Sequence, residues 1–288
     1  MKNLFAAFVA TLLFASQLNA GGPWPSGKGN AYIKLSEWWT VFDEHFTDTG
    51  RIDPNTTSGI FNTFIYTEFG LSDRLTAIAN VPVVSRSVIN NVRSLTTNDI
   101  IFQGDAITSF GDVELGLKYN LSQYGAKIPI SVTLTLGIPS GQSIGGINNN
   151  LQTGDGEFNQ ILTVDAGTGF NIGDAAGYVS GFVGINNRSK GFSEEFRYGA
   201  EVGIGLFNKK LWISGKLNAI ESFKNSDIRS VTSTSIFANN TEFITLGLEA
   251  NVYVTEKFGV SAGFANVTRG EIIAAAPAYS VGVFLDIK

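Results

Sequence analysis

The feature that most constrains the fold of this chain is a period-two alternation of apolar and polar side chains. In "FGDVELGLKYNL" (110–121), every second residue from Val113 to Leu121 is apolar, and the residues between them are charged, polar or Gly. Such alternation is typical of a β-strand with one apolar and one polar face. The pattern recurs in "KIPISVTLTLGI" (127–138) and "EFRYGAEVGIGLF" (195–207). The sequence therefore predicts an all-β protein.

The alternation marks twelve candidate strands, most of them ten or more residues long. Strands in soluble sheets are usually ~5–6 residues long, whereas a tilted strand that crosses a bilayer needs ~9–11 residues. The strand lengths thus favour a membrane-spanning sheet. The candidates lie near 30–42, 57–69, 74–84, 110–121, 127–138, 157–170, 176–186, 195–206, 210–221, 241–254, 257–267 and 278–288.

The connections between these strands alternate between short and long. Short periplasmic turns and longer extracellular loops are typical of outer-membrane barrels. An even strand number then places both termini on the periplasmic side. The short connections cover 70–73, 122–126, 171–175, 208–210 and 255–257, and the longer ones cover about 43–56, 85–109, 139–156, 187–194, 222–240 and 268–277.

A sheet in lipid must close on itself, because lipid cannot satisfy the backbone groups of an edge strand. We therefore predict a closed antiparallel transmembrane β-barrel of about twelve strands over residues 30–288. A soluble β-sandwich or barrel is the alternative. It fits less well, since its strands are usually shorter and its apolar faces pack into a core.

The composition excludes several functional classes. The net charge of −5 gives no basic surface for nucleic acid. The chain has no Cys and one His, so a disulfide framework or a zinc site with nitrogen and sulfur ligands is not expected. We predict no cofactor and no metal.

The N-terminus, "MKNLFAAFVATLLFASQLNA", has a basic residue, an apolar run and an Ala at the expected cleavage position. It is typical of a secretory signal peptide, which we assign to residues 1–20. The next segment, "GGPWPSGKG" (21–29), is rich in Gly and Pro and disfavours regular structure. It is either a loose periplasmic leader or a partial plug of the lumen, anchored by Trp24.

The polar face of the barrel is expected to line the lumen. Charges of both signs inside a narrow wall must be paired or hydrated. They form either a structural salt-bridge network or a polar path for a solute, and the sequence leaves both open. The predicted lumen-lining residues are Lys34, Glu68, Arg74, Asp112, Glu114, Lys118, Asp165, Arg197, Glu201, Lys216, Glu249 and Asp286.

Aromatic residues near the strand ends fit the two interfacial girdles of such barrels. The outer girdle is expected to contain Trp39, Phe61, Phe158 and Phe196, and the periplasmic girdle Phe69, Tyr119, Phe170 and Phe258. The lone His45 lies in the predicted first extracellular loop, and no nucleophile is marked by spacing. We therefore predict that the protein is not an enzyme.

Several motifs follow one another in the first half of the chain: "YTEFGLSDRLTAIANVPVV" (66–84), "FGDVELGLKYNL", "PISVTLTLGIPSG" (129–141) and "TGDGEFNQILTVDAGTGF" (153–170). Together they resemble the outer-membrane "transporter" family named for a meta-pathway of phenol degradation. The resemblance covers about residues 66–170 by motif and the remainder by pattern. It implies an outer-membrane barrel that takes up hydrophobic or aromatic compounds.

We accordingly predict a channel in the bacterial outer membrane for the passive passage of small solutes. The alternative is a non-conducting structural or surface-binding barrel that acts through its extracellular loops. The expected partners are membrane lipid, lipopolysaccharide, the barrel-assembly machinery during biogenesis, and a small-molecule solute. No nucleic acid is expected.

Overall fold

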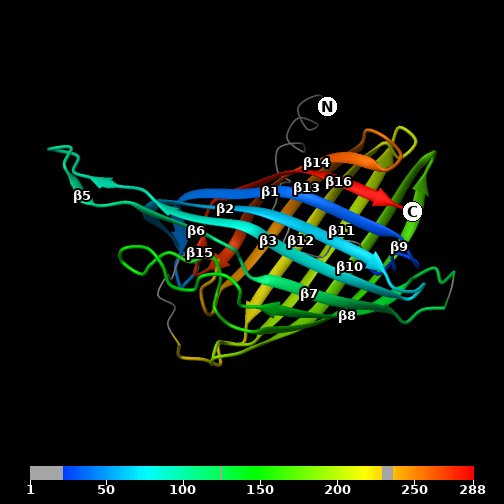
Figure 1. The fold of residues 1–288 in the computed structure, drawn as a ribbon, viewed down its shortest axis with the longest axis horizontal. Helices are drawn as coiled ribbons and strands as arrows, with labels where there is room; N and C mark the ends of the chain where they lie inside the picture. The colour runs from blue at the N-terminus through cyan, green and yellow to red at the C-terminus, as the bar shows by residue number, and fades with distance from the viewer. Residues whose placement is uncertain (1–21, 124, 229–235) are drawn as a thin grey trace, which may run out of the picture.

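A computed structural model describes residues 22–123, 125–228 and 236–288, which fold into one closed antiparallel β-barrel (Figure 1). The predicted signal peptide (1–20) lies outside the described residues. No helix among those residues has the length and apolarity needed to span a membrane. The barrel wall consists of β1 (Ala31–Phe46), β2 (Ile52–Gly70), β3 (Leu75–Ile89), β7 (Val113–Asn120), β8 (Ile130–Ile138), β9 (Asn159–Ile172), β10 (Ala175–Arg188), β11 (Glu195–Leu206), β12 (Leu211–Ser222), β13 (Glu242–Tyr253), β14 (Phe258–Glu271) and β16 (Pro277–Ile287).

The barrel closes because the first strand pairs with the second and with the last. Lys34 on β1 lies opposite Tyr66 on β2 and opposite Phe284 on β16. This continuous pairing leaves no open edge in the wall, which is the condition for a sheet to lie in lipid. The twelve predicted strands and the closed all-β architecture are confirmed.

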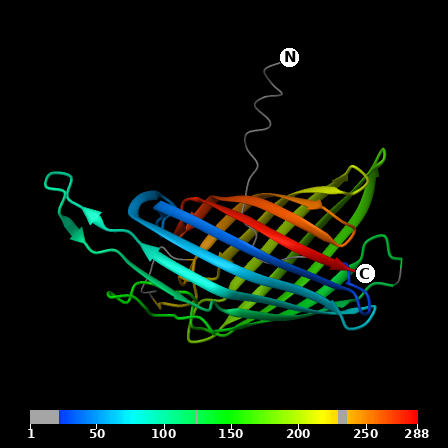
Figure 2. The same cartoon turned by 45° about the horizontal axis from the view of Figure 1, so that its top comes forward.

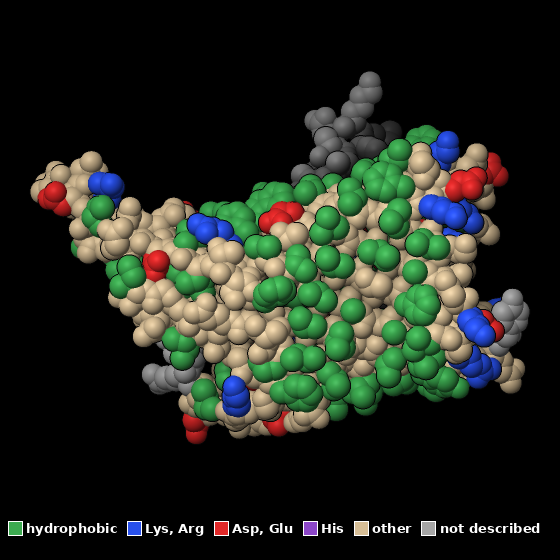
Figure 3. Space-filling model, in the orientation of Figure 1, with side chains coloured by type: hydrophobic (Ala, Val, Ile, Leu, Met, Phe, Trp, Pro, Cys, Tyr) green, Lys and Arg blue, Asp and Glu red, His purple; other side chains and the backbone are tan. Residues whose placement is uncertain are grey.

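The alternation in the sequence corresponds to an outer and an inner face. On β7, Leu115, Leu117 and Tyr119 are exposed on the outside, whereas Lys118 between them is 3% exposed. Figure 3 shows the outer surface with many hydrophobic side chains along the barrel and charged side chains gathered near its ends. The apolar side chains therefore cover the outside, and the polar ones fill the lumen.

Several strands extend further than the periodicity predicts. The predicted connection at 43–56 is wrong at both ends, because β1 continues to Phe46 and β2 begins at Ile52. Pairing continues there between Glu44 and Pro54, beyond a register shift after Phe42. Backbone pairing with a neighbour sustains these strand ends although their side chains no longer alternate cleanly.

The predicted connection at 85–109 is also partly wrong. β3 continues to Ile89 and pairs with β6 (Asp105–Ser109). Between them, β4 (Val92–Arg93) and β5 (Ile100–Phe102) form a hairpin that projects beyond the barrel (Figures 1 and 2). The predicted connection at 268–277 is likewise shortened, by the end of β14 and by β15 (Ile273–Ala274), which pairs with β1.

The two barrel ends differ. The end with the C-terminus carries compact turns such as 71–74 and 207–210, and we call it the short-turn end (Figure 1). The opposite end, with the projecting hairpin and the segments 139–158, 223–228 and 236–241, is called the long-loop end. This asymmetry is the one predicted from the sequence.

Candidate functional site: the charged lumen

Most of the predicted lumen residues lie on strands and point into the barrel. Their side chains belong to inward-facing positions of eight strands, where the closed sheet brings them together. Two residues differ. Asp112 lies in the break between β6 and β7, and Arg74 is exposed in the turn before β3, outside any strand. Arg74 therefore stands at the short-turn mouth and not on the lumen wall.

One ion-pair network connects β1, β11, β12 and β13. The Nζ of Lys34 lies 2.7 Å from Oε1 of Glu249, and the Nζ of Lys216 lies 2.9 Å from Oε2 of the same carboxylate. Lys216 also lies 3.7 Å from Oε2 of Glu201. Each charge in the network thus has an opposite charge beside it, as buried charges require.

A second cluster lies on β2, β7 and β9. Lys118 Nζ lies 3.4 Å from Oε2 of Glu68. The hydroxyl of Tyr66 donates to the other oxygen of Glu68, at 2.5 Å. Asp165 accepts a hydrogen bond from Thr163 at 3.3 Å. These residues are all nearly fully buried, so the charged groups at this level have polar partners and little contact with solvent.

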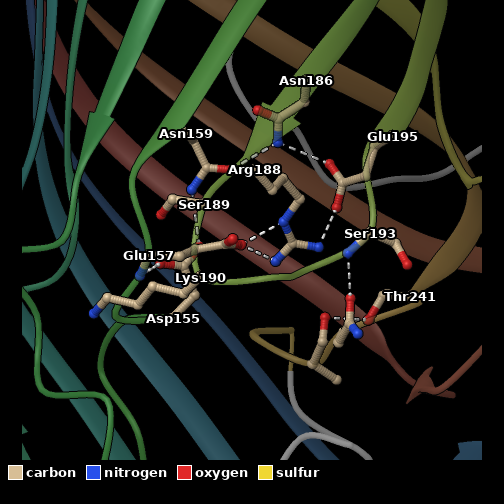
Figure 4. Close-up of polar contacts among 12 residues, drawn as sticks. Asp155, Glu157, Asn159, Asn186, Arg188, Ser189, Lys190, Ser193, Glu195 and Thr241 are labelled. Carbon is tan, nitrogen blue, oxygen red and sulfur yellow. Dashed lines mark hydrogen bonds and ion pairs between the residues drawn. The ribbon is translucent and has the colours of Figure 1, made fainter. Parts of the chain in front are cut away.

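A third cluster lies at the long-loop end (Figure 4). Arg188 binds Glu157 and, at 2.7 Å, Glu195. Glu195 also accepts from Arg197 at 2.7 Å and from Asn186 at 3.1 Å. Burial raises the pKa of Glu157 to about 8, although the charge of Arg188 opposes this shift.

Glu157, Arg188 and Glu195 are not among the lumen-lining residues predicted from the sequence. Arg188 and Glu195 end the inward rows that hold Asn186 and Arg197, so their parity was available as a signal. Glu157 begins the strand predicted at 157–170 with the parity of Asp165, although the observed β9 begins only at Asn159. Only the folded chain brings it to Arg188.

Asp112 holds the segment that connects β8 to β9. Its Oδ1 accepts from the amide of Gly141 at 2.8 Å, and its Oδ2 accepts from the amide of Asp155 at 2.7 Å. One carboxylate therefore fixes both ends of the loop, which was predicted at 139–156. Asp112, which was predicted to line the lumen, thus holds this loop in place.

The leader residues from Gly22 onward contact several inward-facing side chains. The carbonyl of Pro23 accepts from Ser131 Oγ at 2.6 Å and from Asn120 Nδ2 at 3.0 Å. The Trp24 ring lies 5.8 Å from that of Tyr178 on β10. Ser26 donates to Glu68 at 3.1 Å, and its amide donates to Thr76 at 3.0 Å. The segment therefore crosses the barrel interior from β2 and β3 toward β10.

The predicted girdle residues lie on the outer face. Trp39 stacks on Tyr279 of β16 at 5.8 Å, and Phe61 of β2 pairs with Trp39. At the short-turn end, Phe69 and Tyr119 are exposed. The other four, Phe158, Phe170, Phe196 and Phe258, share the outward parity of their strands. Whether they contact lipid headgroups stays a prediction.

His45 was predicted to lie in the first extracellular loop, and this prediction is wrong. The residue lies on β1, where it pairs with Asp53 and Ala274. The backbone pairing of the extended strand ends places it there. Its Nδ1 is buried without a hydrogen-bond partner. Among the residues that the structure describes, no three His, Cys, Asp or Glu side chains are arranged to hold a metal ion.

No family model and no curated protein matches the sequence. Solved structures do match the fold. A COG4313 outer membrane channel from Pseudomonas putida F1 is 12% identical, with a TM-score of 0.57 over 95% of this chain and 100% of that chain. The fold is that of an outer-membrane β-barrel.

Two further outer-membrane β-barrels are similar at lower scores. KdgM porin is 10% identical, with a TM-score of 0.48 over 89% of this chain and 99% of that chain. The β domain of the Bordetella autotransporter BrkA is 12% identical, with a TM-score of 0.49 over 90% of this chain and 100% of that chain. Because these identities are low, the likeness concerns the fold, and the family resemblance noted from the sequence stays a prediction.

Proposed function

We propose that this chain is a passive channel of the bacterial outer membrane for small solutes. The observation that carries the proposal is the polar, charged lumen behind an apolar outer face, seen on β7 in Lys118 and its exposed neighbours Leu117 and Tyr119. The short-turn end would face the periplasm, because short periplasmic turns are typical of exported barrels. The outward aromatic and aliphatic side chains would contact lipid and lipopolysaccharide.

Hydrophobic or aromatic solutes are the class implied by the family resemblance. Aromatic rings inside the barrel support this choice. Tyr32 stacks on Phe284 at 5.7 Å, and Tyr253 meets the same Phe284 edge-on at 5.0 Å. Phe284 itself is buried, so the partly exposed rings of Tyr32 and Tyr253 would offer a solute apolar contact beside the charged groups.

The leader would act as a partial plug. It extends from Glu68 on β2, bonded by the hydroxyl of Ser26, to Tyr178 on β10, which contacts the ring of Trp24. A solute path would then open when this segment moves. Conductance measured with and without residues 22–29 tests the plug, and equal conductance would contradict it.

Single-channel recording in planar bilayers tests the channel itself. Glu114→Ala and Lys118→Ala should change conductance or ion selectivity in opposite directions, since they remove opposite charges from the same strand. Glu221→Ala is the matched control, because Glu221 accepts from Tyr198 on the outer face. A protein that neither conducts nor lets liposomes take up solute would refute the channel.

A second candidate is a barrel that binds a partner through its long-loop end. The β4–β5 hairpin favours it, because Leu95 is fully exposed at its tip and Ile101 is 69% exposed. Replacing residues 91–103 with a short Gly-containing turn should abolish such binding and leave the barrel folded. Unchanged adhesion to cells or surfaces would remove this candidate.

A further inference from the structure

Three aromatic rings contact one another at the level of the leader, and the middle ring, Tyr178, is hydrogen-bonded to a carboxylate. The rings of Trp24 and Tyr178 lie 5.8 Å apart at 81°, and those of Tyr178 and Trp212 lie 5.7 Å apart at 44°. The Tyr178 hydroxyl donates to Oε1 of Glu201. Beside them is a cavity of about 270 Å³, lined by Gly22, Trp24, Tyr178, Ser180 and Glu201.

Two glycines of β11 let the rings lie against the wall. A Cβ at Gly203 would fall 2.2 Å from Cε1 of Tyr178, and a Cβ at Gly205 would fall 2.9 Å from Trp212. Tyr178 comes from β10 and Trp212 from β12, the two neighbours of β11. Each ring therefore occupies the space that a side chain at its glycine would need.

Glu201 is the less closely paired of the two carboxylates beside Lys216. Glu201 lines the cavity, whereas its cationic neighbour Lys216 lies 3.7 Å away and is held more closely by Glu249, at 2.9 Å. No Lys or Arg lines the cavity. Aromatic faces and a carboxylate around one small space attract a cation that also has apolar surface.

We propose that this cavity is a binding site for a small organic cation, such as a quaternary ammonium or alkylammonium solute. The cation would rest against the rings of Tyr178 and Trp24, with Glu201 as the counter-charge and Trp212 behind Tyr178. The inference rests on the proposed channel function, for which it names a solute class. Because Trp24 belongs to the leader, the site is complete only while the leader lies in the lumen.

The test is calorimetric titration of the purified full barrel in detergent micelles with choline and with its uncharged isostere, 3,3-dimethylbutan-1-ol. Choline should bind, and the isostere should bind at least ~10-fold more weakly, because the two differ in charge and not in shape. Glu201→Gln should weaken choline binding about 10-fold without changing the isostere. Equal affinities, or no choline binding, would overturn the proposal.

Two further variants distinguish loss of the binding site from misfolding of the barrel. Trp24→Leu lies in the leader and not in the barrel wall, and it should weaken choline binding by about 10-fold. Glu221→Gln makes the same change in a Tyr–Glu pair outside the lumen, so this variant should bind choline like the parent. Full binding by the Trp24 variant, or an equal loss in the Glu221 variant, would refute the site.

Conductance recorded on the same preparations separates this inference from the channel. Conduction without choline binding would refute the site and keep the channel. Choline binding without conduction or solute uptake would keep the site and refute the channel.

Discussion

The Nζ of Lys34 lies 2.7 Å from Oε1 of Glu249, although the two residues are 215 positions apart in the chain. Lys34 is on β1 and Glu249 on β13, and β16 and β14 stand between them in the wall. Because Lys216 holds the other oxygen of Glu249, this carboxylate is the shared counter-charge of two buried lysines. Barrel closure is what brings the three groups together.

Glu249→Gln should destabilise the barrel by about 3–5 kcal/mol, since it leaves two buried ammonium groups without their main counter-charge. Lys34→Met should cost less, because Lys216 still pairs with Glu249. Urea unfolding in detergent micelles measures both. Glu221→Gln on the outer face should stay within about 0.5 kcal/mol of the parent. A Lys34 variant that is less stable than the Glu249 variant would contradict the view that both lysines share this carboxylate.

Glu157 predicts a dependence of stability on pH. Burial raises its pKa to about 8 in the folded barrel, against about 4.3 for an ordinary Glu. The folded state thus holds this proton more tightly than the unfolded state. Protonated Glu157 contributes fully to the free energy of unfolding below about pH 4.3. This contribution is lost as the pH rises to about 8, by about 1.4 kcal/mol per pH unit within that window.

Urea unfolding from pH 4 to pH 9 measures this slope. Glu157→Gln should remove the part of the slope that Glu157 contributes. Glu194 is partly exposed, and hydrogen bonding from Asn225 lowers its pKa. Glu194→Gln should therefore leave the pH dependence of stability above pH 5 unchanged. An unchanged slope in the Glu157 variant would assign the titration to another group.

Gly70 predicts a way to displace the leader. A Cβ at Gly70 would fall 1.7 Å from the carbonyl oxygen of Gly27, so Gly70→Ala must push the leader away. Gly169 also faces inward, but its nearest atom would lie 3.7 Å from a Cβ. If the leader narrows the lumen, Gly70→Ala should raise single-channel conductance and Gly169→Ala should not. Equal conductance of the two variants would mean that the leader does not limit the path.

Ser131 gives an independent test of the same segment. Its hydroxyl donates to the carbonyl of Pro23 at 2.6 Å, and both groups are buried. Ser131→Ala leaves that carbonyl with Asn120 alone and should speed protease cleavage within 22–29. Ser261 on β14 is also a buried serine, so Ser261→Ala is the control. Cleavage at the parent rate in both variants would show that this hydrogen bond does not hold the leader.

The sequence by itself determined the strands and their two faces. Alternation is a local property of each strand, because neighbouring side chains point to opposite sides of a sheet. It therefore predicted the twelve strands, and it separated Lys118 from Leu117 and Tyr119 on β7. The same rule fails where alternation fades but pairing continues, as at His45, and in turns, as at Arg74.

Only the tertiary structure decided which inward groups meet. Glu249 bridges Lys34 and Lys216, and Glu157 reaches Arg188, because the sheet closes and its strands lie in a fixed register. A period of two gives the face of a side chain but neither its height on the barrel nor the strand that lies across the lumen. The pairing of charges, the path of the leader and the aromatic cavity at Glu201 all depend on that closure.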